Sequence, residues 1–186
     1  MKKTLSLFAL SLALAVSAQA QESNGQFNLS FRSGVAQTDV ETFCRTQLPR
    51  LSEGTTFQVS RDVTDQYGTR HITLQQYVDG LKADGCQVLV HMRNDKVQSI
   101  NGNVITKQMM PEPAARKAAV RQETEGKEVV LYVKDGVAHQ AYKTVKGGKR
   151  LVIDAQSGEV LSSKSVRRNW DGPTGQSVKA TGLTMF

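Results

Sequence analysis

The spacing of the apolar residues changes along the chain, and each change predicts a new element. Val40 and Phe43 begin a series of apolar residues at helical intervals, which predicts a helix with one buried face. Thr38 and Glu41 stand three residues apart at its start, as in a helix-capping box. The pattern therefore predicts a helix that begins at Thr38 and ends near Pro49, since proline disrupts a helix interior.

From residue 56 the apolar residues alternate with polar ones, which is the period of a half-buried strand. The alternating runs are separated by turn-forming pairs such as Asp79-Gly80 and Asn94-Asp95. A helix followed by consecutive strands predicts an antiparallel sheet with the helix on one face. The predicted strands are residues 56–63, 72–78, 86–92 and 97–104.

Pro111 and Pro113 interrupt this pattern, and a second series follows. Residues 114–122 are rich in alanine and predict another helix, and Asp135-Gly136 is a strong hairpin signal. The repeated order predicts an α+β fold of two small units, each a helix packed on an antiparallel sheet. The second unit, of about 60 residues, would be marginally stable alone, so we expect it to pack on the first. Its predicted strands are residues 129–134, 137–145, 151–155 and 159–163.

The first twenty residues have the parts of a secretory signal peptide. An apolar run over residues 5–16 precedes a small-x-small sequence, which predicts cleavage between Ala20 and Gln21. A membrane anchor is the alternative, but a run of about twelve residues is too short to cross a bilayer core of about 30 Å. We therefore expect a secreted or periplasmic protein without a stable membrane anchor. Residues 21–37 are polar and predict a flexible lead-in.

Positive charge exceeds negative charge in the chain but is not concentrated. The 186 residues include 24 Lys and Arg against 17 Asp and Glu, and without Lys2 and Lys3 of the signal peptide the excess falls from seven to five. A nucleic-acid-binding surface needs a basic stripe with interleaved aromatic residues, and the sequence has no such stripe. We therefore expect no nucleic-acid partner. A mild positive excess would at most steer an acidic protein partner.

Cys44 and Cys86 are the two cysteines of the chain. In the oxidising environment outside the cytoplasm they could form a disulfide, and closing that loop would stabilise the fold by about 4 kcal/mol. Two buried free thiols are the alternative, and the sequence leaves both open. Cys44 lies on the apolar face of the predicted helix, which is not the exposed, electropositive environment of a reactive thiol.

The search for catalytic chemistry is negative. His71, His91 and His139 lie far apart in the sequence, and none belongs to an HExxH pair. His91 and His139 fall within alternating strands, where a half-exposed histidine is a simpler interpretation than a zinc ligand. The sequence also lacks a GxSxG motif and a P-loop. We therefore predict no catalytic, cofactor-binding or metal-binding residues, and no enzyme activity.

Residues 68–104 follow a longer pattern. Its parts are a strand ending in Gln-Gln before an aromatic residue, a loop between two glycines, an alternating strand ending in His, and a Val-x-Ser-x-Asn-Gly strand. This pattern resembles the FTP segment of thermolysin-like metallopeptidase propeptides. The family often has Gly-(Val/Ile)-Pro-Val in the loop, where this chain has Gly-Leu-Lys-Ala, so we expect a less rigid loop. The matching residues are Gln75, Gln76 and Tyr77; Gly80 to Gly85; Val88 to His91; and Val97, Ser99, Asn101 and Gly102.

The second unit resembles the PepSY domain of the same propeptides. The resemblance rests on the alanine-rich helix at Pro113–Val120, the strand at residues 140–142 and the sequence LVIDAQSGEVL at residues 151–161. Together the two resemblances cover residues 38–166 and imply a cystatin-like unit followed by a PepSY-like unit. The implied organisation is a signal peptide at 1–20, a lead-in at 21–37, an FTP-like domain at 38–107, a PepSY-like domain at 108–166, and a processing arm with the start of a truncated mature region at 167–186.

Near the end of the sequence, Gly172-Pro173-Thr174-Gly175 resembles the first residues of a mature thermolysin-like catalytic domain. The zinc-binding HExxH motif does not follow in this sequence. The chain is then either the N-terminal part of a longer precursor or the product of a shortened gene. In both cases we expect this polypeptide to lack peptidase machinery.

The resemblance implies a secreted propeptide that acts as an intramolecular chaperone and inhibitor of a thermolysin-like metallopeptidase. Its partner would be the catalytic domain, in cis or in trans, and zinc would belong to that domain, so no cofactor is expected here. Arg167, Arg168 and Asn169 would lie in the arm that docks in the cleft and is processed. The alternatives are a freestanding secreted protease inhibitor or envelope-binding module, and the remnant of a truncated protease gene.

Overall fold

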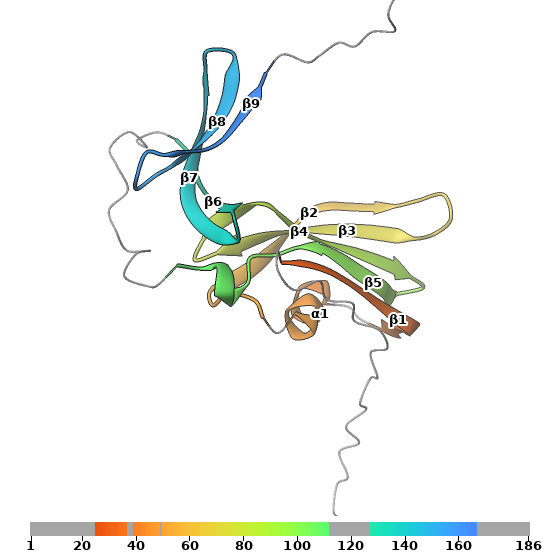
Figure 1. The fold of residues 1–186 in the computed structure, drawn as a ribbon. Helices are drawn as coiled ribbons and strands as arrows, with labels where there is room; N and C mark the ends of the chain where they lie inside the picture. The colour runs from red at the N-terminus through yellow and green to blue at the C-terminus, as the bar shows by residue number, and fades with distance from the viewer. Residues whose placement is uncertain (1–24, 37–38, 49, 112–126, 167–186) are drawn as a thin grey trace, which may run out of the picture.

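The computed structural model describes residues 25–36, 39–48, 50–111 and 127–166, and these residues are mainly β-structure (Figure 1). They form nine strands, one α-helix and one short 3-10 helix. The elements are β1 (Gln26–Ala36), α1 (Val40–Gln47), β2 (Thr55–Thr64), β3 (Arg70–Val78), β4 (Leu81–Arg93), β5 (Lys96–Asn103), η1 (Lys107–Met109), β6 (Val129–Lys134), β7 (Val137–Lys146), β8 (Lys149–Asp154) and β9 (Val160–Ser165).

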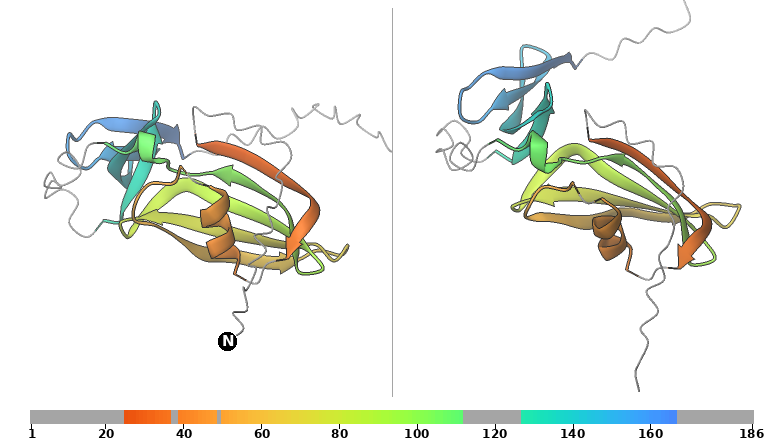
Figure 2. Two further views of the ribbon diagram at one scale, coloured as in Figure 1. Left: turned by 90° about the horizontal axis from the view of Figure 1, so that it is seen from below. Right: turned by 60° about the horizontal axis from the view of Figure 1, so that its bottom comes forward.

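All nine strands belong to one mixed sheet. The antiparallel order is β2-β3-β4-β5-β1 in its first half and β6-β7-β8-β9 in its second half. The two halves join where β4 runs parallel to β6, with Ala83 beside Leu131. The second half rises from one end of the first in Figure 1, and α1 lies on one face of the first half in Figure 2.

The expected fold class, an α+β arrangement of two helix-on-sheet units, is wrong. The fold is mostly β, and α1 is the one α-helix among the described residues. The reason lies in β4, which begins at Leu81 and not at residue 86 as predicted. This extra length brings β4 beside β6 and joins the two expected sheets into one. The predicted second helix, residues 114–122, lies outside the described residues.

The flexible lead-in predicted for residues 21–37 is also wrong over Gln26–Ala36, which form β1. Along this strand Phe27 and Leu29 alternate with polar residues and pack against the core. Leu29 pairs with Ile100 of β5, so the strand is one edge of the first half of the sheet. The polar and small residues of this stretch resemble a loop in composition, although their alternation has the period of a strand.

The predicted first helix is confirmed, but its cap is not the predicted one. The N-cap is Asp39, whose carboxylate accepts a hydrogen bond from the backbone N–H of Thr42 at 3.0 Å. Thr38 lies outside the described residues. Glu41, expected to complete a capping box, accepts instead from the backbone N–H of Phe57 at 3.2 Å. Glu41 therefore ties the start of α1 to β2.

The main hydrophobic core lies between α1 and the first half of the sheet. Burying each Val, Leu or Ile side chain is worth about 1.5–3 kcal/mol, so this layer determines which face of the sheet is covered. The opposite face of β1, β3, β4 and β5 is left free of the helix. The buried members of the core are Phe43, Cys44, Leu48, Phe57, Ile72, Leu74, Val88, Val90, Met92, Val97, Ile100 and Val104.

A second buried cluster joins the two halves of the sheet. Most of its members come from the first half and from the segment after β5, and two come from β6 and β7. An ion pair between Asp84 of β4 and Lys143 of β7 crosses the same junction. The second half therefore packs on the first, as the sequence predicted. The buried members are Val78, Ala83, Cys86, Ile105, Met109, Leu131 and Ala138.

Candidate functional site

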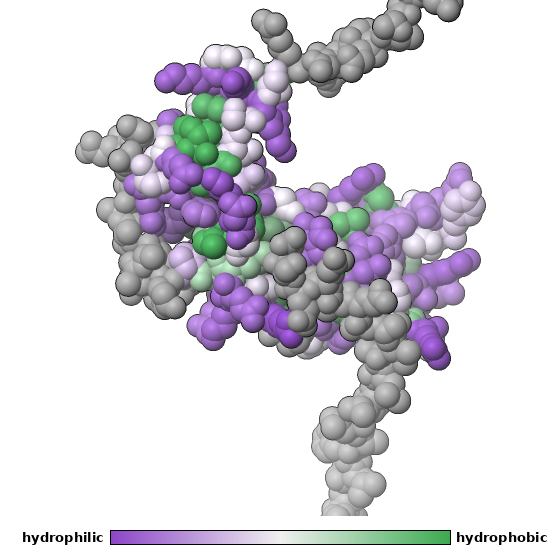
Figure 3. Space-filling model, viewed as in Figure 1, coloured by the Kyte–Doolittle hydropathy of each residue, from purple (hydrophilic) through white to green (hydrophobic). Residues whose placement is uncertain are grey.

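The face of the sheet opposite α1 presents mainly uncharged, hydrogen-bonding side chains in its centre. Side chains alternate between the two faces of a strand. Val88, Val90 and Met92 of β4 point into the core, so the residues that alternate with them, and their cross-strand partners, point away from the helix. Figure 3 shows the mainly hydrophilic surface of this half of the molecule. This outer face comprises Gln26, Asn28 and Ser30 of β1, Ser99, Asn101 and Asn103 of β5, Gln87, Leu89 and His91 of β4, and His71, Thr73 and Gln75 of β3.

An open groove of about 490 Å³ lies on this outer face, between β1, β4 and β5. Amide side chains dominate its lining, and Asn103 contributes a buried Oδ1 atom without a hydrogen-bond partner, the one such side-chain atom among the described residues. A buried acceptor without a partner is unfavourable, so this position favours a donor from outside the chain. The lining residues are Gln26, Phe27, Asn28, Gly85, Gln87, Leu89, Asn101, Gly102 and Asn103.

The amides define what the groove can bind. Each Asn or Gln side chain both donates and accepts hydrogen bonds, as a peptide group does. Asn28 and Asn101 are direct cross-strand partners, and so are Gln26 and Asn103, so these amides stand in two neighbouring rows. An uncharged polar surface of this kind suits a protein segment with exposed backbone groups. The groove is therefore a candidate docking surface.

Two histidines meet on the same outer face. His71 of β3 and His91 of β4 are direct cross-strand partners, and their Nδ1 atoms lie 2.8 Å apart. The Nε2 atom of His71 lies 2.9 Å from Oδ2 of Asp65. The other carboxylate oxygen of Asp65 accepts from the backbone N–H groups of Tyr67 and Thr69, each at 2.9 Å. The turn between β2 and β3 thus fixes a chain of three polar side chains.

The surroundings of this cluster lower the pKa of His91 and of Asp65. Partial burial lowers the pKa of His91, and the neighbouring His71 lowers it further. The pKa of Asp65 is lowered, first by the hydrogen bond from His71 and then by that from the backbone of Thr69. Asp65 is therefore ionised at neutral pH, and His91 resists protonation.

We expect the free energy of unfolding to fall as the pH is lowered from about 7 toward 5. The pKa of His91 in the folded chain lies below its ordinary value of 6.5, so within this window the unfolded chain binds a proton that the folded chain does not. Stability from this residue is therefore present above pH 6.5 and is lost as the pH falls through the window. Urea unfolding at several pH values will measure it, and His91→Gln should flatten the dependence.

The lowered pKa of Asp65 acts in a different range. An ionised carboxylate of depressed pKa loses its contribution only as the pH falls below about 4, so it does not mask the histidine effect. Equal slopes for the wild-type chain and His91→Gln between pH 7 and 5 would contradict the assignment to His91.

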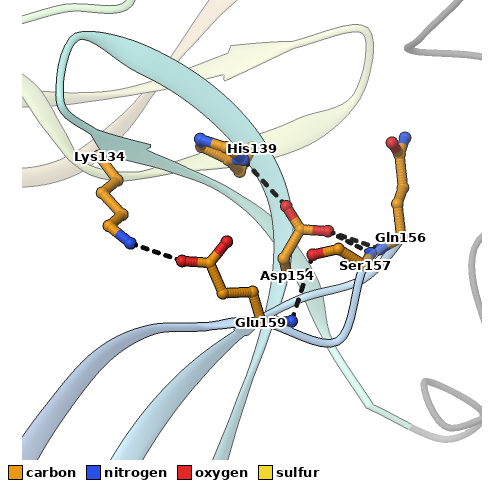
Figure 4. Close-up of polar contacts among 6 residues, drawn as sticks. All are labelled: Lys134, His139, Asp154, Gln156, Ser157 and Glu159. Carbon is orange, nitrogen blue, oxygen red and sulfur yellow. Dashed lines mark hydrogen bonds and ion pairs between the residues drawn. The ribbon is translucent and has the colours of Figure 1, made fainter.

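In the second half of the sheet, Asp154 organises the turn between β8 and β9 (Figure 4). Its carboxylate accepts from the backbone N–H groups of Gln156 at 2.8 Å and Ser157 at 2.7 Å, and lies 2.9 Å from Nδ1 of His139. Burial alone would raise the pKa of Asp154, but these hydrogen bonds outweigh it and the pKa is lowered. The DAQSGE part of the sequence LVIDAQSGEVL therefore has a structural role: Asp154 closes the turn, and Glu159 pairs with Lys134 of β6 at 2.8 Å.

The two cysteines are free and buried, and no disulfide joins them in the structure. Cys44 belongs to the core under α1, whereas Cys86 belongs to the cluster at the junction of the two halves. Burial raises the pKa of Cys44 to about 12 and that of Cys86 to about 11. Neither thiol is thus a nucleophile at neutral pH.

The other predicted site residues lie outside the described residues. These are Ala20 and Gln21 at the signal cleavage site and Arg167, Arg168 and Asn169 of the arm, which stay predictions. Among the described residues, no group of three or more His, Cys, Asp or Glu side chains is arranged to hold a metal ion. The described helices also include none that is both long and apolar enough to cross a membrane.

Sequence reasoning missed both features of the outer face. It treated His71 and His91 as distant because twenty residues separate them, whereas the β3–β4 hairpin places them side by side. The signal for the groove is the alternation of Asn101 and Asn103 with core residues of β5. Such alternation identifies an exposed face, but the neighbouring amides of β1 could be added only after β1 was known to be a strand.

Comparison with known proteins gives one family match. Residues 55–104, which span β2 to β5, match the FTP family, the Fungalysin/Thermolysin Propeptide Motif. The segment resembling FTP, residues 68–104, lies within this match and is confirmed. The motif is a propeptide motif and not a catalytic domain, which is consistent with a non-enzymatic segment that associates with a protease catalytic domain.

Among solved structures, the chain is similar to the Bacillus megaterium YpeB C-terminal domain. The sequences are 11% identical, the TM-score is 0.31, and the similarity covers 76% of this chain and 72% of that one. No curated protein shows significant similarity to the chain.

Proposed function

We propose that this chain is a secreted or periplasmic propeptide that assists the folding of a thermolysin-like metallopeptidase and inhibits it. The observation that supports this most directly is the match of residues 55–104 to the FTP propeptide motif. In this proposal the second half of the sheet is the PepSY-like part, and the catalytic zinc belongs to the partner. The chain itself needs no cofactor.

The outer face supplies the docking surface in this proposal. Its centre is uncharged, and its groove contains the rows of amides and the unpartnered Oδ1 of Asn103. A docked polypeptide segment would donate a hydrogen bond to that atom, and interfaces of this kind combine polar contacts with trapped water. Folding assistance would then come from a preformed β-surface, on which the catalytic domain orders its own segments.

Inhibition requires a second element that reaches the catalytic cleft. The chain continues beyond Ser165, where β9 ends, into the basic residues Arg167 and Arg168. We assign cleft docking and processing to this arm. Leu161 of β9 belongs to a buried cluster, so a truncation that removes only residues 167–186 spares the sheet.

The test uses the purified exported chain and an unfolded thermolysin-like catalytic domain of matched origin. Dilution in the presence of the chain should recover more peptidase activity than dilution without it, and the chain should inhibit the folded catalytic domain. The truncated chain should lose inhibition more than folding assistance. The chain alone should hydrolyse no peptide, with or without added zinc. Failure both to bind and to refold any such domain at micromolar concentration, about −8 kcal/mol, would contradict the proposal.

Variants of the groove test where docking occurs. A double variant, Gln87→Glu with Asn101→Glu, places two charges in an uncharged groove and should weaken binding of the catalytic domain at least tenfold. The matched control is Gln58→Glu on the edge strand β2, which is exposed and outside the groove, and should bind as the wild-type chain does. Equal affinities for the double variant and the control would place the docking surface elsewhere.

A further inference from the structure

We propose that His71 and His91 form a binding site for a divalent first-row transition-metal cation of the kind that prefers imidazole, such as Cu²⁺, Ni²⁺ or Zn²⁺. This site lies outside the groove and does not rest on the proposed propeptide function. The proposal comes from the convergence of two imidazole nitrogens on the outer face and from the carboxylate behind one of them.

The positions of the two rings suit chelation. The side chains project from directly paired residues of β3 and β4, and their Nδ1 atoms already lie 2.8 Å apart. Zinc–nitrogen bonds of 2.0–2.1 Å in tetrahedral geometry need nitrogens about 3.3 Å apart, so the rings have to separate by about half an ångström. The rings meet edge to face, with centroids 5.0 Å apart, and the His71 side chain is 37% exposed, so solvent ions reach the pair and the rings have room to adjust.

Asp65 prepares His71 as a ligand. The carboxylate is held by two backbone N–H groups of the turn, and its Oδ2 accepts a hydrogen bond from the Nε2–H group of His71. Because Nε2 of His71 carries the proton, its Nδ1 atom is unprotonated, and the lone pair of that atom faces His91. A carboxylate that orients the far nitrogen of a histidine is the usual outer contact of a metal-binding histidine, and it raises the basicity of the ligand.

Metal binding requires one proton to move within the pair. In the neutral pair His91 donates its Nδ1 proton to Nδ1 of His71, and on metal binding that proton transfers through water to Nε2 of His91. Both Nδ1 atoms then coordinate the cation, and no net proton is released when both imidazoles start out neutral. At lower pH a protonated imidazole must lose its proton first, so binding weakens.

The coordination is open on the solvent side. Asp65 contacts the far nitrogen of His71, and among the described residues no group of three or more His, Cys, Asp or Glu is arranged to hold a metal ion, so water completes the coordination shell. Two imidazoles therefore give a site of modest affinity, and the order of affinity should be Cu²⁺ above Ni²⁺ and Zn²⁺.

The experiment measures binding of each metal ion alone to the purified exported chain at pH 7.5 by calorimetry, with ¹H–¹⁵N spectra of the histidine rings as a second readout. We expect one zinc or copper ion per chain at this site and selective shifts of the His71 and His91 ring signals. His71→Gln and His91→Gln should each weaken binding at least tenfold. The matched control, His139→Gln, should bind as the wild-type chain does, because its contact with Asp154 lies in the other half of the sheet.

A milder variant keeps the test valid if either histidine variant unfolds. Asp65→Asn retains an oxygen for the backbone N–H groups but cannot hold the imidazole as a carboxylate does, and should weaken binding 10- to 100-fold. Wild-type affinity in a folded His71→Gln, His91→Gln or Asp65→Asn chain would overturn the proposal. So would titration of the wild-type chain without a shift in the two ring signals.

Discussion

Replacing Gln76 with leucine should lower the free energy of unfolding by about 2–4 kcal/mol, because the buried backbone N–H of Ile105 loses its partner and the carbonyl oxygen of Ile105 keeps only a 3.5 Å hydrogen bond from the backbone N–H of Ser52. The side chain is fully buried at the end of β3. Its Oε1 accepts from the backbone N–H of Ile105 at 2.7 Å, and its Nε2 donates to the carbonyl oxygen of Ile105 at 3.0 Å and to the hydroxyl of Thr55 at 3.3 Å. Leucine fills a similar volume but satisfies none of these groups.

Chemical denaturation of the purified chain measures this loss, and Gln58→Leu is the matched control. Gln58 is exposed on the neighbouring strand β2, so the same substitution there should change the free energy of unfolding by about 0.5 kcal/mol or less. A change of similar size in both variants would show that the hydrogen bonds of Gln76 do not stabilise the segment after β5.

The adjacent Gln75 has a related role. Its Nε2 atom lies within hydrogen-bond distance of the carbonyl oxygens of Gln76, Ala83 and Cys86, at 3.0, 2.7 and 3.1 Å, and its Oε1 accepts from Gln87. These contacts hold the irregular part of β4, where the register with β3 shifts between Gln75 and Tyr77. The Gln-Gln pair by which the sequence resembles propeptides therefore stabilises the fold, and it need not contact a partner.

Local signals in the sequence predicted most strands and turns. Asp79, Asn94 and Asp135 all adopt positive φ in the structure, as their turn pairs indicated. The strand predicted at residues 129–134 has the observed bounds of β6. These features depend on a few residues that are neighbours in the sequence, and a single sequence contains that information directly.

The features that were missed depend on pairing between distant residues. The predicted loop between Gly80 and Gly85 is instead the start of β4. Leu81 and Lys82 pair with β3, and Ala83 gains a parallel neighbour in β6, almost fifty residues further along the chain. The His71–His91 contact likewise requires the register of β3 against β4, which a shift of one residue would abolish. The alternation of a strand predicts its faces but does not identify its neighbours.

The Asn-Gly end of the propeptide-like pattern leads to the second large effect. Gly102 of β5 has a φ of +144°, and a Cβ atom there would lie 2.0 Å from the backbone carbonyl oxygen of Gln87 on β4. Gly102→Ala should therefore lower the free energy of unfolding by about 3 kcal/mol or more, from the unfavourable φ together with the displacement of β4. Denaturant titration of the variant measures the loss directly.

Gly68→Ala separates the two contributions. Gly68, in the turn between β2 and β3, also has a positive φ, +77°, but a Cβ atom there would meet no atom within 4 Å. Gly68→Ala should therefore lower the free energy of unfolding only through the unfavourable φ, by about 1–2 kcal/mol. If Gly102→Ala costs no more than Gly68→Ala, β4 and β5 do not approach as closely as the structure shows. The groove that Gly102 helps to line would then have a different shape, because its lining comes from both strands.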